Sequence, residues 1–168
     1  MIVSFSARTL QLSAPQASQL LSTADDDVVS TFLQSLDTYR PRLEVEVLAV
    51  KRVGAGAGVS YGHTYRTSSP TTLALVAIGY GHGIPRKAGN RASVTLEGRR
   101  MPIVGRVAMD VLVIDAGDAP IAAGSRVVFF GDPETGETPL AEWADAVAEN
   151  PYSLLACLDH RVSRVVAP

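Results

Sequence analysis

The sequence contains a single cysteine and no apolar run long enough to span a membrane. The lone Cys157 excludes an internal disulfide, and no cysteine and histidine residues are spaced as zinc ligands, so we predict no metal site. Cys157 is predicted to be a small buried residue, with an exposed reactive thiol as the alternative. The N-terminus lacks a basic start followed by an apolar segment. A cytoplasmic protein without membrane contact is expected.

The sequence also lacks a marked excess of charge. The 15 basic and 17 acidic residues give a formal net charge of −2, which provides no basic field for a nucleic acid or an anionic membrane. With 46% hydrophobic and 19% charged residues, the composition is typical of a globular domain. The 168 residues fit one domain and are too few for a (β/α)₈ barrel, which needs about 250. We expect a small molecule or another protein as the partner.

Alternation of apolar and charged residues from position 43 to 53 predicts a half-buried strand. Gly54, Gly56 and Gly58 then break the pattern and indicate a loop or bulge that delivers Tyr61 to its position. Further strands are predicted at 72–78, 92–96, 100–104, 111–115 and 125–130, with a tight hairpin turn at 97–99. Many short strands joined by glycine and proline turns are typical of a barrel or a sandwich.

Short helices are predicted at about 139–149 and near the N-terminus. Thr138 is the expected cap of the first, because a proline follows it and apolar residues then recur at spacings of three and four. The Asn150-Pro151 pair ends this helix. Two helices are predicted in the first third of the chain, at 14–21 after Ser13 and at 26–36.

Three motifs lie between positions 59 and 110. They read Val-Ser-Tyr-Gly-His-Thr-Tyr from Val59, Val-Ala-Ile-Gly-Tyr-Gly-His-Gly-Ile-Pro-Arg from Val76, and Pro-Ile-Val-Gly-Arg-Val-Ala-Met-Asp from Pro102. Together they resemble the C-terminal domain of alanine racemases. The resemblance implies a mainly β fold, a small closed or partly open β-barrel over residues 42–168. Residues 1–41 are then the N-terminal strand and helical connector that complete the domain.

The resemblance also implies that the cofactor half of the enzyme is missing here. In such racemases a (β/α)₈ barrel holds pyridoxal phosphate through a lysine, and this chain has no room for that barrel. Lys51 and Lys87 are the only lysines, and neither lies in a recognisable cofactor motif. We therefore expect no cofactor on this chain alone, with pyridoxal phosphate present only if a barrel partner supplies it. Self-sufficient racemisation is rejected, because the carbanion needs an electron sink.

Tyr61 is the foremost catalytic candidate. By resemblance it stands across the substrate from the lysine of the other subunit and exchanges the α-proton. A free phenol has a pKa of about 10, so a base near neutrality requires a nearby cation or hydrogen-bond donor. In the family those donors come largely from the missing barrel. An arbitrary tyrosine would more simply pack against the glycine-rich loop; the full motif around Tyr61 favours the functional interpretation.

Four residues are expected to bind substrate. The resemblance implies that Met109 contributes a backbone contact to the substrate carboxylate and that Tyr80, Arg86 and Arg106 line the entrance. Arginines suit this role because they bind carboxylates through paired donors. For Arg106, a surface ion pair is an equal alternative. Asp110 is expected to hold a neighbouring arginine or a backbone group.

Tyr152 and His82 are candidates with strong structural alternatives. Tyr152, with Arg161 after it, matches the tyrosine that hydrogen-bonds the cofactor phosphate, but it would equally pack on the barrel. His82 stands where the family typically has an aspartate, and Gly81 replaces an alanine. A histidine can donate or accept a proton at neutral pH, which makes His82 a candidate catalytic acid or base. The alternative is a loop histidine that replaces one hydrogen bond with another.

Three functions remain open from the sequence. In the first, the chain supplies Tyr61 and the entrance residues in trans to a pyridoxal-phosphate barrel protein of the amino-acid racemase or isomerase type. In the second, it is an autonomous, cofactor-independent isomerase, lyase or cyclase that uses a cleft of Tyr61, Tyr80, His82 and Arg86. In the third, it is a non-catalytic module that binds a small ligand. A homodimer is the alternative to a barrel partner.

Overall fold

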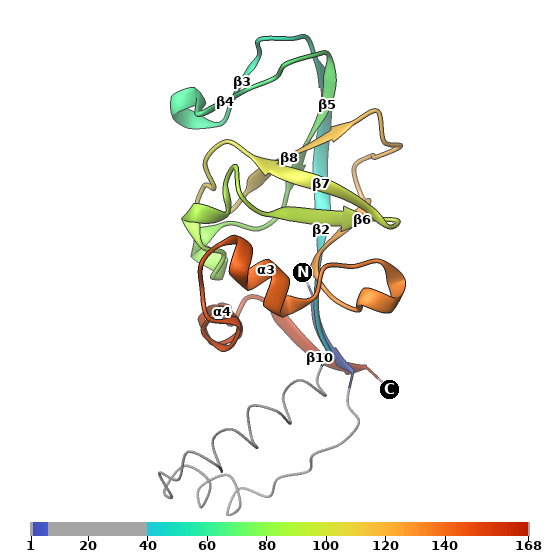
Figure 1. Ribbon diagram of the computed structural model, residues 1–168, viewed down its shortest axis with the longest axis vertical. Coiled ribbons are helices and arrows are strands. Elements are labelled where there is room, and N and C mark those ends of the chain that lie inside the picture. Colours follow the sequence, from blue (N-terminus) through green and yellow to red (C-terminus); the bar gives the residue numbers. More distant parts are fainter. Residues whose placement is uncertain (1, 7–39, 168) are drawn as a thin grey trace, which may run out of the picture.

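A closed β-barrel of six strands forms the centre of the computed structural model, which describes residues 2–6 and 40–167 (Figure 1). Around the ring the strands are β2 (Arg40–Val53), β5 (Thr71–Val76), β8 (Leu112–Gly117), β7 (Arg99–Val104), β6 (Ser93–Leu96) and β9 (Arg126–Phe130). Pairing of β9 with β2 closes the ring. The predicted mainly β fold and barrel are confirmed, and the strands begin and end within three residues of the predicted positions.

The long strand β2 pairs with three neighbours along its length. It bonds to β9 from Leu43 to Glu46 and to β5 from Val47 to Val53. The register shifts between Leu43 and Glu44 and again between Val47 and Ala49, and such bulges bend a strand from one neighbour toward the next. The first part of β2 also pairs with β1 (Ile2–Ser6), which in turn lies parallel to β10 (Ser163–Ala167). These two strands extend the sheet beyond the ring.

The predicted helices at 14–21 and 26–36, with Ser13, lie outside the described residues, as do positions 7–12 of the N-terminal segment. The division of the chain at residue 41 therefore stays a prediction.

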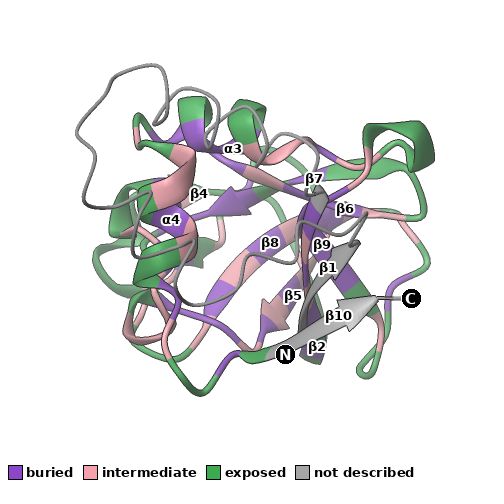
Figure 2. Cartoon of the chain, turned by 90° about the horizontal axis from the view of Figure 1, so that it is seen from below, coloured by how far each residue is buried: buried purple, intermediate pink, exposed green. Residues whose placement is uncertain are grey.

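Alternate residues of the barrel strands point inward and form the core. In β2, Leu43, Val45 and Val47 are at most 1% exposed, while their neighbours are half-buried or exposed. β8 alternates in the same way (Figure 2). This period of two is the pattern that the sequence shows from position 43 onward. The turn between β6 and β7 is also as predicted, because Glu97 and Gly98 both have positive φ (48° and 74°), as in the type I′ turn of a two-residue hairpin.

Two short helices, α3 (Leu140–Ala146) and α4 (Pro151–Cys157), cover the barrel, each with a buried and an exposed side (Figure 2). The sequence pattern predicts only the first. Thr138 is not its cap: the helix begins after Pro139 without a side-chain cap, and within the described residues Thr138 Oγ1 makes no hydrogen bond. Asn150 instead begins α4, because its Oδ1 accepts from the backbone N–H groups of Tyr152 and Ser153 at 2.9 and 3.3 Å.

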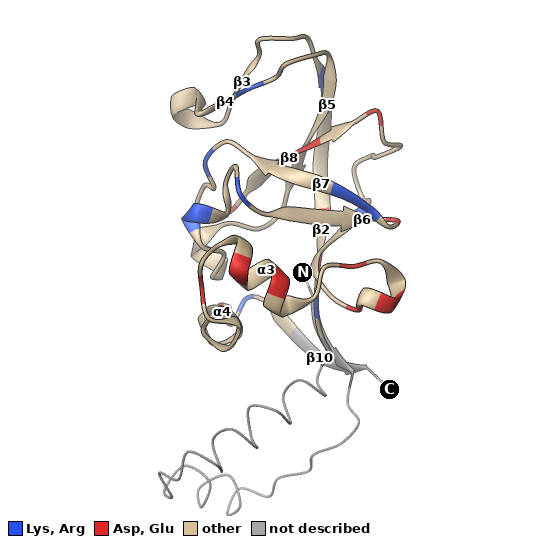
Figure 3. Ribbon diagram, in the orientation of Figure 1, with Lys and Arg blue, Asp and Glu red and all other residues tan. Residues whose placement is uncertain are grey.

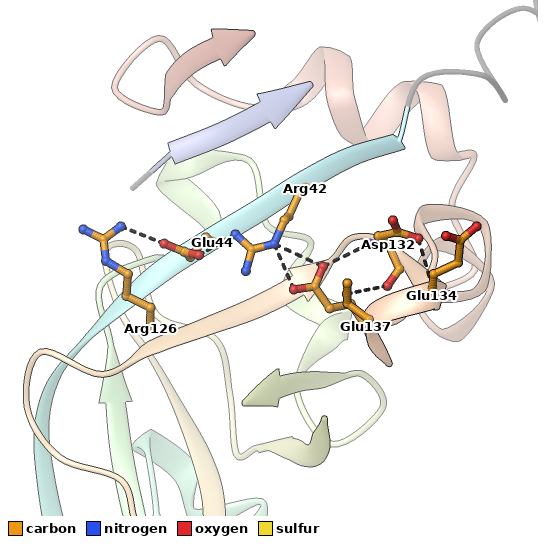
Figure 4. Close-up of polar contacts among 7 residues, drawn as sticks. Arg42, Glu44, Arg126, Asp132, Glu134 and Glu137 are labelled. Carbon is orange, nitrogen blue, oxygen red and sulfur yellow. Dashed lines mark hydrogen bonds and ion pairs between the residues drawn. The ribbon is translucent and has the colours of Figure 1, made fainter. Parts of the chain in front are cut away.

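Charged side chains reinforce the closure of the ring beside β2 and β9 (Figure 4). Arg42 Nε donates to both carboxylate oxygens of Glu137, at 2.9 and 3.1 Å, and the same guanidinium pairs with Glu44. Arg126 of β9 donates to Glu44 at 2.8 Å. Burial acts to raise the pKa of Glu44, but the two arginines outweigh it, so this pKa is lowered. The network links β2 to β9 and to the segment after η4 (Pro133–Thr135).

Elsewhere basic and acidic positions are dispersed among the elements, with acidic residues on α3 and basic residues on β7 (Figure 3). No helix of the described residues is both long and apolar enough to cross a membrane.

Replacing Trp143 with alanine is expected to lower the free energy of unfolding by about 3–5 kcal/mol. The indole is 1% exposed, packs on Phe129 and Phe130 with ring centroids 6.0 and 6.2 Å away, and donates from Nε1 to Ser93 O at 2.9 Å. Urea denaturation followed by circular dichroism measures the change. Leu48→Ala, at a side chain that is 49% exposed, is the control and should cost far less; equal losses would contradict the packing role of Trp143.

Candidate functional site

Three irregular segments meet on one side of the barrel and carry the predicted site residues other than Tyr152 (Figure 1). The first is the hairpin of β3 (Gly58–Val59) and β4 (Tyr65–Arg66), with the turn η1 (Tyr61–His63) at its tip. The second follows β5 and contains the turns η2 (Tyr80–His82) and η3 (Arg86–Ala88). The third is the loop 105–111 between β7 and β8. Tyr61, Tyr80, His82, Arg86, Arg106 and Met109 all lie on these segments.

Tyr61 lies between two arginines. Its phenolic oxygen accepts a hydrogen bond from Arg86 Nη2 at 2.9 Å and donates to Val107 O at 3.3 Å. The Arg106 guanidinium carbon is 5.3 Å from the centroid of the Tyr61 ring, a cation–π contact. Arg86 is thus a cationic hydrogen-bond donor to the phenolic oxygen. The family resemblance leads us to expect such donors largely from a missing barrel, but Arg86 provides one within this chain.

The hairpin that presents Tyr61 is held in an uncommon backbone conformation. Ser60 has φ 59° and ψ 178°, a region that costs a residue with a side chain about 1–3 kcal/mol. Its hydroxyl donates to Arg106 O at 2.7 Å, which secures the strained residue to the loop 105–111. At the other end of the turn, Tyr65 Oη bonds to Asp115 Oδ2 of β8 at 2.8 Å. Burial and this carboxylate raise the pKa of Tyr65, so it stays a neutral hydrogen-bond donor.

Backbone hydrogen bonds hold the segment of Tyr80 beside the segment of Met109. The N–H of Tyr80 donates to Ala108 O at 2.9 Å and that of Gly81 donates to Met109 O at 2.8 Å. The Arg86 guanidinium carbon lies 5.3 Å from the Tyr80 ring centroid, so one arginine contacts both site tyrosines. Tyr80 is 39% and Met109 54% exposed. The structure thus brings together five of the predicted residues: Tyr61, Tyr80, Arg86, Arg106 and Met109.

His82 is oriented by the backbone rather than by the Tyr61 group. Its Nδ1 accepts from Gly79 N–H at 3.3 Å, and among the described residues it has no hydrogen bond to Tyr61 or Arg86. Burial and the charge of Arg161 lower the pKa of His82, against the opposing effect of Asp110 and Asp159. The imidazole is therefore neutral near pH 7, in the tautomer whose unprotonated Nδ1 accepts the hydrogen bond from Gly79 N–H.

Arg161 connects the end of the chain to this segment. Its Nε donates to Asp159 at 2.6 Å, its Nη1 lies 3.6 Å from Asp110, and its Nη2 donates to Gly81 O. The hydrogen bonds from Arg161 lower the pKa of Asp159 to about 2. The expectation that Asp110 holds a neighbouring arginine is confirmed.

A cleft of about 430 Å³ lies beside the site, between the η2–η3 segment and α4. Its lining includes Tyr80, Arg86, Ser153 and Cys157, whereas Tyr61 and His82 are not part of it. The prediction of a buried cysteine is wrong: Leu154 and Leu158 take the buried side of α4, so Cys157 is exposed. Tyr152 lies half-buried in the first turn of α4.

The residues present do not fit a pyridoxal-phosphate site. Lys87 Nζ donates to Ala148 O and pairs with Glu149, each at 2.8 Å, and Lys51 lies exposed on β2. The one amine near α4 is thus already engaged by a carbonyl oxygen and a carboxylate. Within the described part of the chain, no three His, Cys, Asp or Glu side chains are grouped to hold a metal ion.

Two polar residues of the site, Asp115 and Asn90, were not predicted from the sequence. Asp115 binds Tyr65, and Asn90 donates to Thr64 Oγ1 at 3.3 Å and accepts from Gly105 N–H at 2.7 Å. For Asn90 one signal exists: a Gly-Asn pair after a basic turn is typical of a left-handed residue, and Asn90 has φ 62°. Nothing in the sequence pattern indicates what its side chain binds.

Fold and site together define a small closed β-barrel domain that presents a tyrosine between two arginines on an exposed face. The chain belongs to the alanine racemase C-terminal domain family: residues 41–166 match the family model described as alanine racemase, C-terminal domain.

The relatives are named alanine racemases. That of Thermobifida fusca is 45% identical over 123 residues, which cover 73% of this chain and 33% of that protein. That of Salinispora arenicola is 48% identical over 109 residues, which cover 65% and 29%. The solved alanine racemase of Streptomyces coelicolor A3(2) superposes with a TM-score of 0.72 at 38% identity, covering 76% of this chain and 33% of that chain. This chain thus spans about a third of the length of its relatives.

His82 is expected to titrate with a pKa below the free-imidazole value of 6.5. Because the folded state disfavours the proton, the contribution of neutral His82 to stability is present above about pH 6.5 and is lost as the pH falls through the lowered pKa. Two-dimensional ¹H–¹⁵N spectra of the imidazoles, assigned with His82→Gln, measure the midpoint and the Nδ1 acceptor tautomer. A midpoint at or above 6.5 would contradict this environment.

Proposed function

We propose that this chain supplies the catalytic tyrosine of an amino-acid racemase in trans, to a pyridoxal-phosphate barrel carried by another protein. The observation that supports the proposal most directly is the Tyr61 hydroxyl, which is held by Arg86 at 2.9 Å on a side chain that is still 45% exposed. Membership of the alanine racemase C-terminal domain family supports the reaction type. The substrate we propose is alanine, because the relatives are alanine racemases.

In this proposal Tyr61 moves the α-proton at one face of the substrate. In the direction that starts from the phenolate, the Tyr61 oxygen accepts the proton from the α-carbon and becomes the phenol; in the reverse direction the phenol gives that proton back. Arg86 fixes the position of that oxygen, and Arg106 adds a second positive charge over the ring. The partner must provide the group on the opposite face and the electron sink that a carbanion beside a carboxylate needs.

The exposed face of the site supports a protein partner. Of the five large hydrophobic side chains that are exposed in the described residues, Tyr61, Tyr80 and Met109 belong to this site. Arg86 and Arg106 form no ion pair within the described part of the chain, so a partner can offer them carboxylates. Apolar side chains mixed with free cations are typical of a surface that another protein covers. A second copy of this chain is the alternative occupant.

The test starts from the protein purified from its own cells. Native mass spectrometry is expected to show it bound to a pyridoxal-phosphate protein, and the complex should exchange the α-proton of L-alanine with D₂O, followed by ¹H NMR. Tyr61→Phe should lower that exchange at least about 100-fold, because it removes the proton-transferring group. Glu97→Gln, on the remote β6–β7 hairpin, is the matched control and should exchange at the wild-type rate. A homomeric protein, or full exchange in Tyr61→Phe, would contradict the proposal.

A second candidate function, binding of a small ligand, is favoured by the cleft beside α4. Its volume of about 430 Å³ is in the range of small-molecule sites, and Arg86 and Tyr80 in its lining suit a carboxylate and an apolar group. An autonomous acid–base enzyme has weaker support, because neither Tyr61 nor His82 lines this cleft.

Filling the cleft should remove any such binding. A panel of small carboxylic acids is screened by saturation-transfer NMR against the wild-type protein, and the hits are expected to lose their signal with Ser153→Trp, whose indole occupies the space. Glu97→Gln serves again as the control. The absence of hits, or hits that bind Ser153→Trp equally well, would contradict this second function.

A further inference from the structure

Three segments of backbone approach one another closely at Gly105. A Cβ atom added to Gly89, just after η3, would lie 2.1 Å from Gly105 O. A Cβ atom added to Gly105 would lie 2.9 Å from both Val59 O and the Cβ of Ser60 in the Tyr61 hairpin. Real Cβ atoms do not tolerate such distances, so Gly89 and Gly105 let the segments touch. The three segments are those that carry Arg86, Arg106 and Tyr61.

Asn90 lies at this junction and bonds to both of the other segments. Its Oδ1 accepts from Gly105 N–H at 2.7 Å, directly before Arg106, and its Nδ2 donates to Thr64 Oγ1 at 3.3 Å, at the end of the η1 turn. Its backbone N–H donates to Ile103 O at 2.9 Å. The residue has φ 62°, a left-handed conformation that asparagine adopts more readily than most residues.

Packing alone does not fix Tyr61. No residue of η1 is buried, and Tyr61, Gly62 and His63 are all exposed. Exposed turns with few buried contacts open and move readily unless hydrogen bonds hold them. The placement of the Tyr61 oxygen against Arg86 therefore depends on the polar contacts that bind the hairpin to its neighbours.

We propose that Asn90 is a positioning residue that sets the relative placement of Tyr61, Arg86 and Arg106. It follows the η3 turn that carries Arg86, it fixes the residue before Arg106 through Gly105, and it holds the end of the Tyr61 turn through Thr64. Only the catalytic consequence of this inference rests on the proposed function. The positioning itself is a property of the isolated chain and is measured without a partner.

The deciding variant is Asn90→Gly, which keeps the left-handed backbone accessible and removes both side-chain hydrogen bonds. The protein is labelled with 3-fluorotyrosine, and the ¹⁹F signal of Tyr61 is assigned with Tyr61→Phe. In Asn90→Gly we expect the Tyr61 signal to shift or broaden while that of Tyr65, bonded to Asp115, stays in place. Asn90→Asp should restore the wild-type signal, because a carboxylate accepts from both Gly105 N–H and the Thr64 hydroxyl.

Two further variants separate positioning from a general loss of structure. Thr64→Val removes one of the two contacts and should change the Tyr61 signal in the same sense, with no further change when combined with Asn90→Gly. Glu97→Gly alters another exposed residue of positive φ, 48°, in the β6–β7 turn and should leave the Tyr61 signal unchanged. An unchanged Tyr61 signal in Asn90→Gly, or an equal shift in Glu97→Gly, would overturn the proposal.

The catalytic consequence is measured with the native complex. There Asn90→Gly should lower kcat for α-proton exchange roughly 10- to 100-fold with a much smaller change in KM, as expected when a reacting group is misplaced. If the wild-type complex shows no exchange, the proposed function fails, while the ¹⁹F comparison still decides the role of Asn90. An active wild type with unchanged kcat in Asn90→Gly would overturn the inference.

Discussion

The site depends on the closure of the barrel by one strand. β2 bonds to β9 with its first half and to β5 with its second, and the register shift between Val47 and Ala49 marks the change of neighbour. Closure fixes where each loop emerges. Val76 at the end of β5 pairs with Leu112 at the start of β8, so the η2–η3 segment and the loop 105–111 leave the same end of the barrel. These two segments carry every predicted site residue except Tyr61 and Tyr152.

The Tyr61 hairpin starts from the opposite end. Val53 at the end of β2 pairs with Thr71 at the start of β5, and six residues of β5 span roughly 20 Å. The hairpin must therefore fold back along the barrel to bring Ser60 to Arg106. A hairpin that runs back over this length with an exposed turn needs hydrogen bonds to hold it in place. These are the contacts made by Tyr65 and Asn90, and the same path requires the uncommon backbone conformation of Ser60. The geometry of Tyr61 is thus a long-range property of the fold.

The sequence predicts the parts of this structure that follow from local periodicity or from a motif. Alternation locates the strands, and the motifs name Tyr61, Arg86 and Arg106, which the structure then brings into contact. The sequence does not predict α4, because an Asn-Pro pair such as Asn150-Pro151 is as suited to end one helix as to begin the next. The contacts of Asn90 and Asp115 are not predicted either, since their partners, Gly105 and Tyr65, lie 15 and 50 residues away in the chain. The catalytic roles themselves stay predictions.

His82 shows how a departure from a family motif can leave the fold intact. An aspartate at this position would accept the Gly79 N–H through a carboxylate oxygen, and His82 accepts it through Nδ1 at 3.3 Å. The exchange keeps the acceptor and removes a negative charge next to Arg161. That arginine remains compensated, because Asp159 bonds to it at 2.6 Å and Asp110 lies 3.6 Å away. The local electrostatics therefore account for a neutral histidine at this position, while a role of His82 in proton transfer stays a prediction.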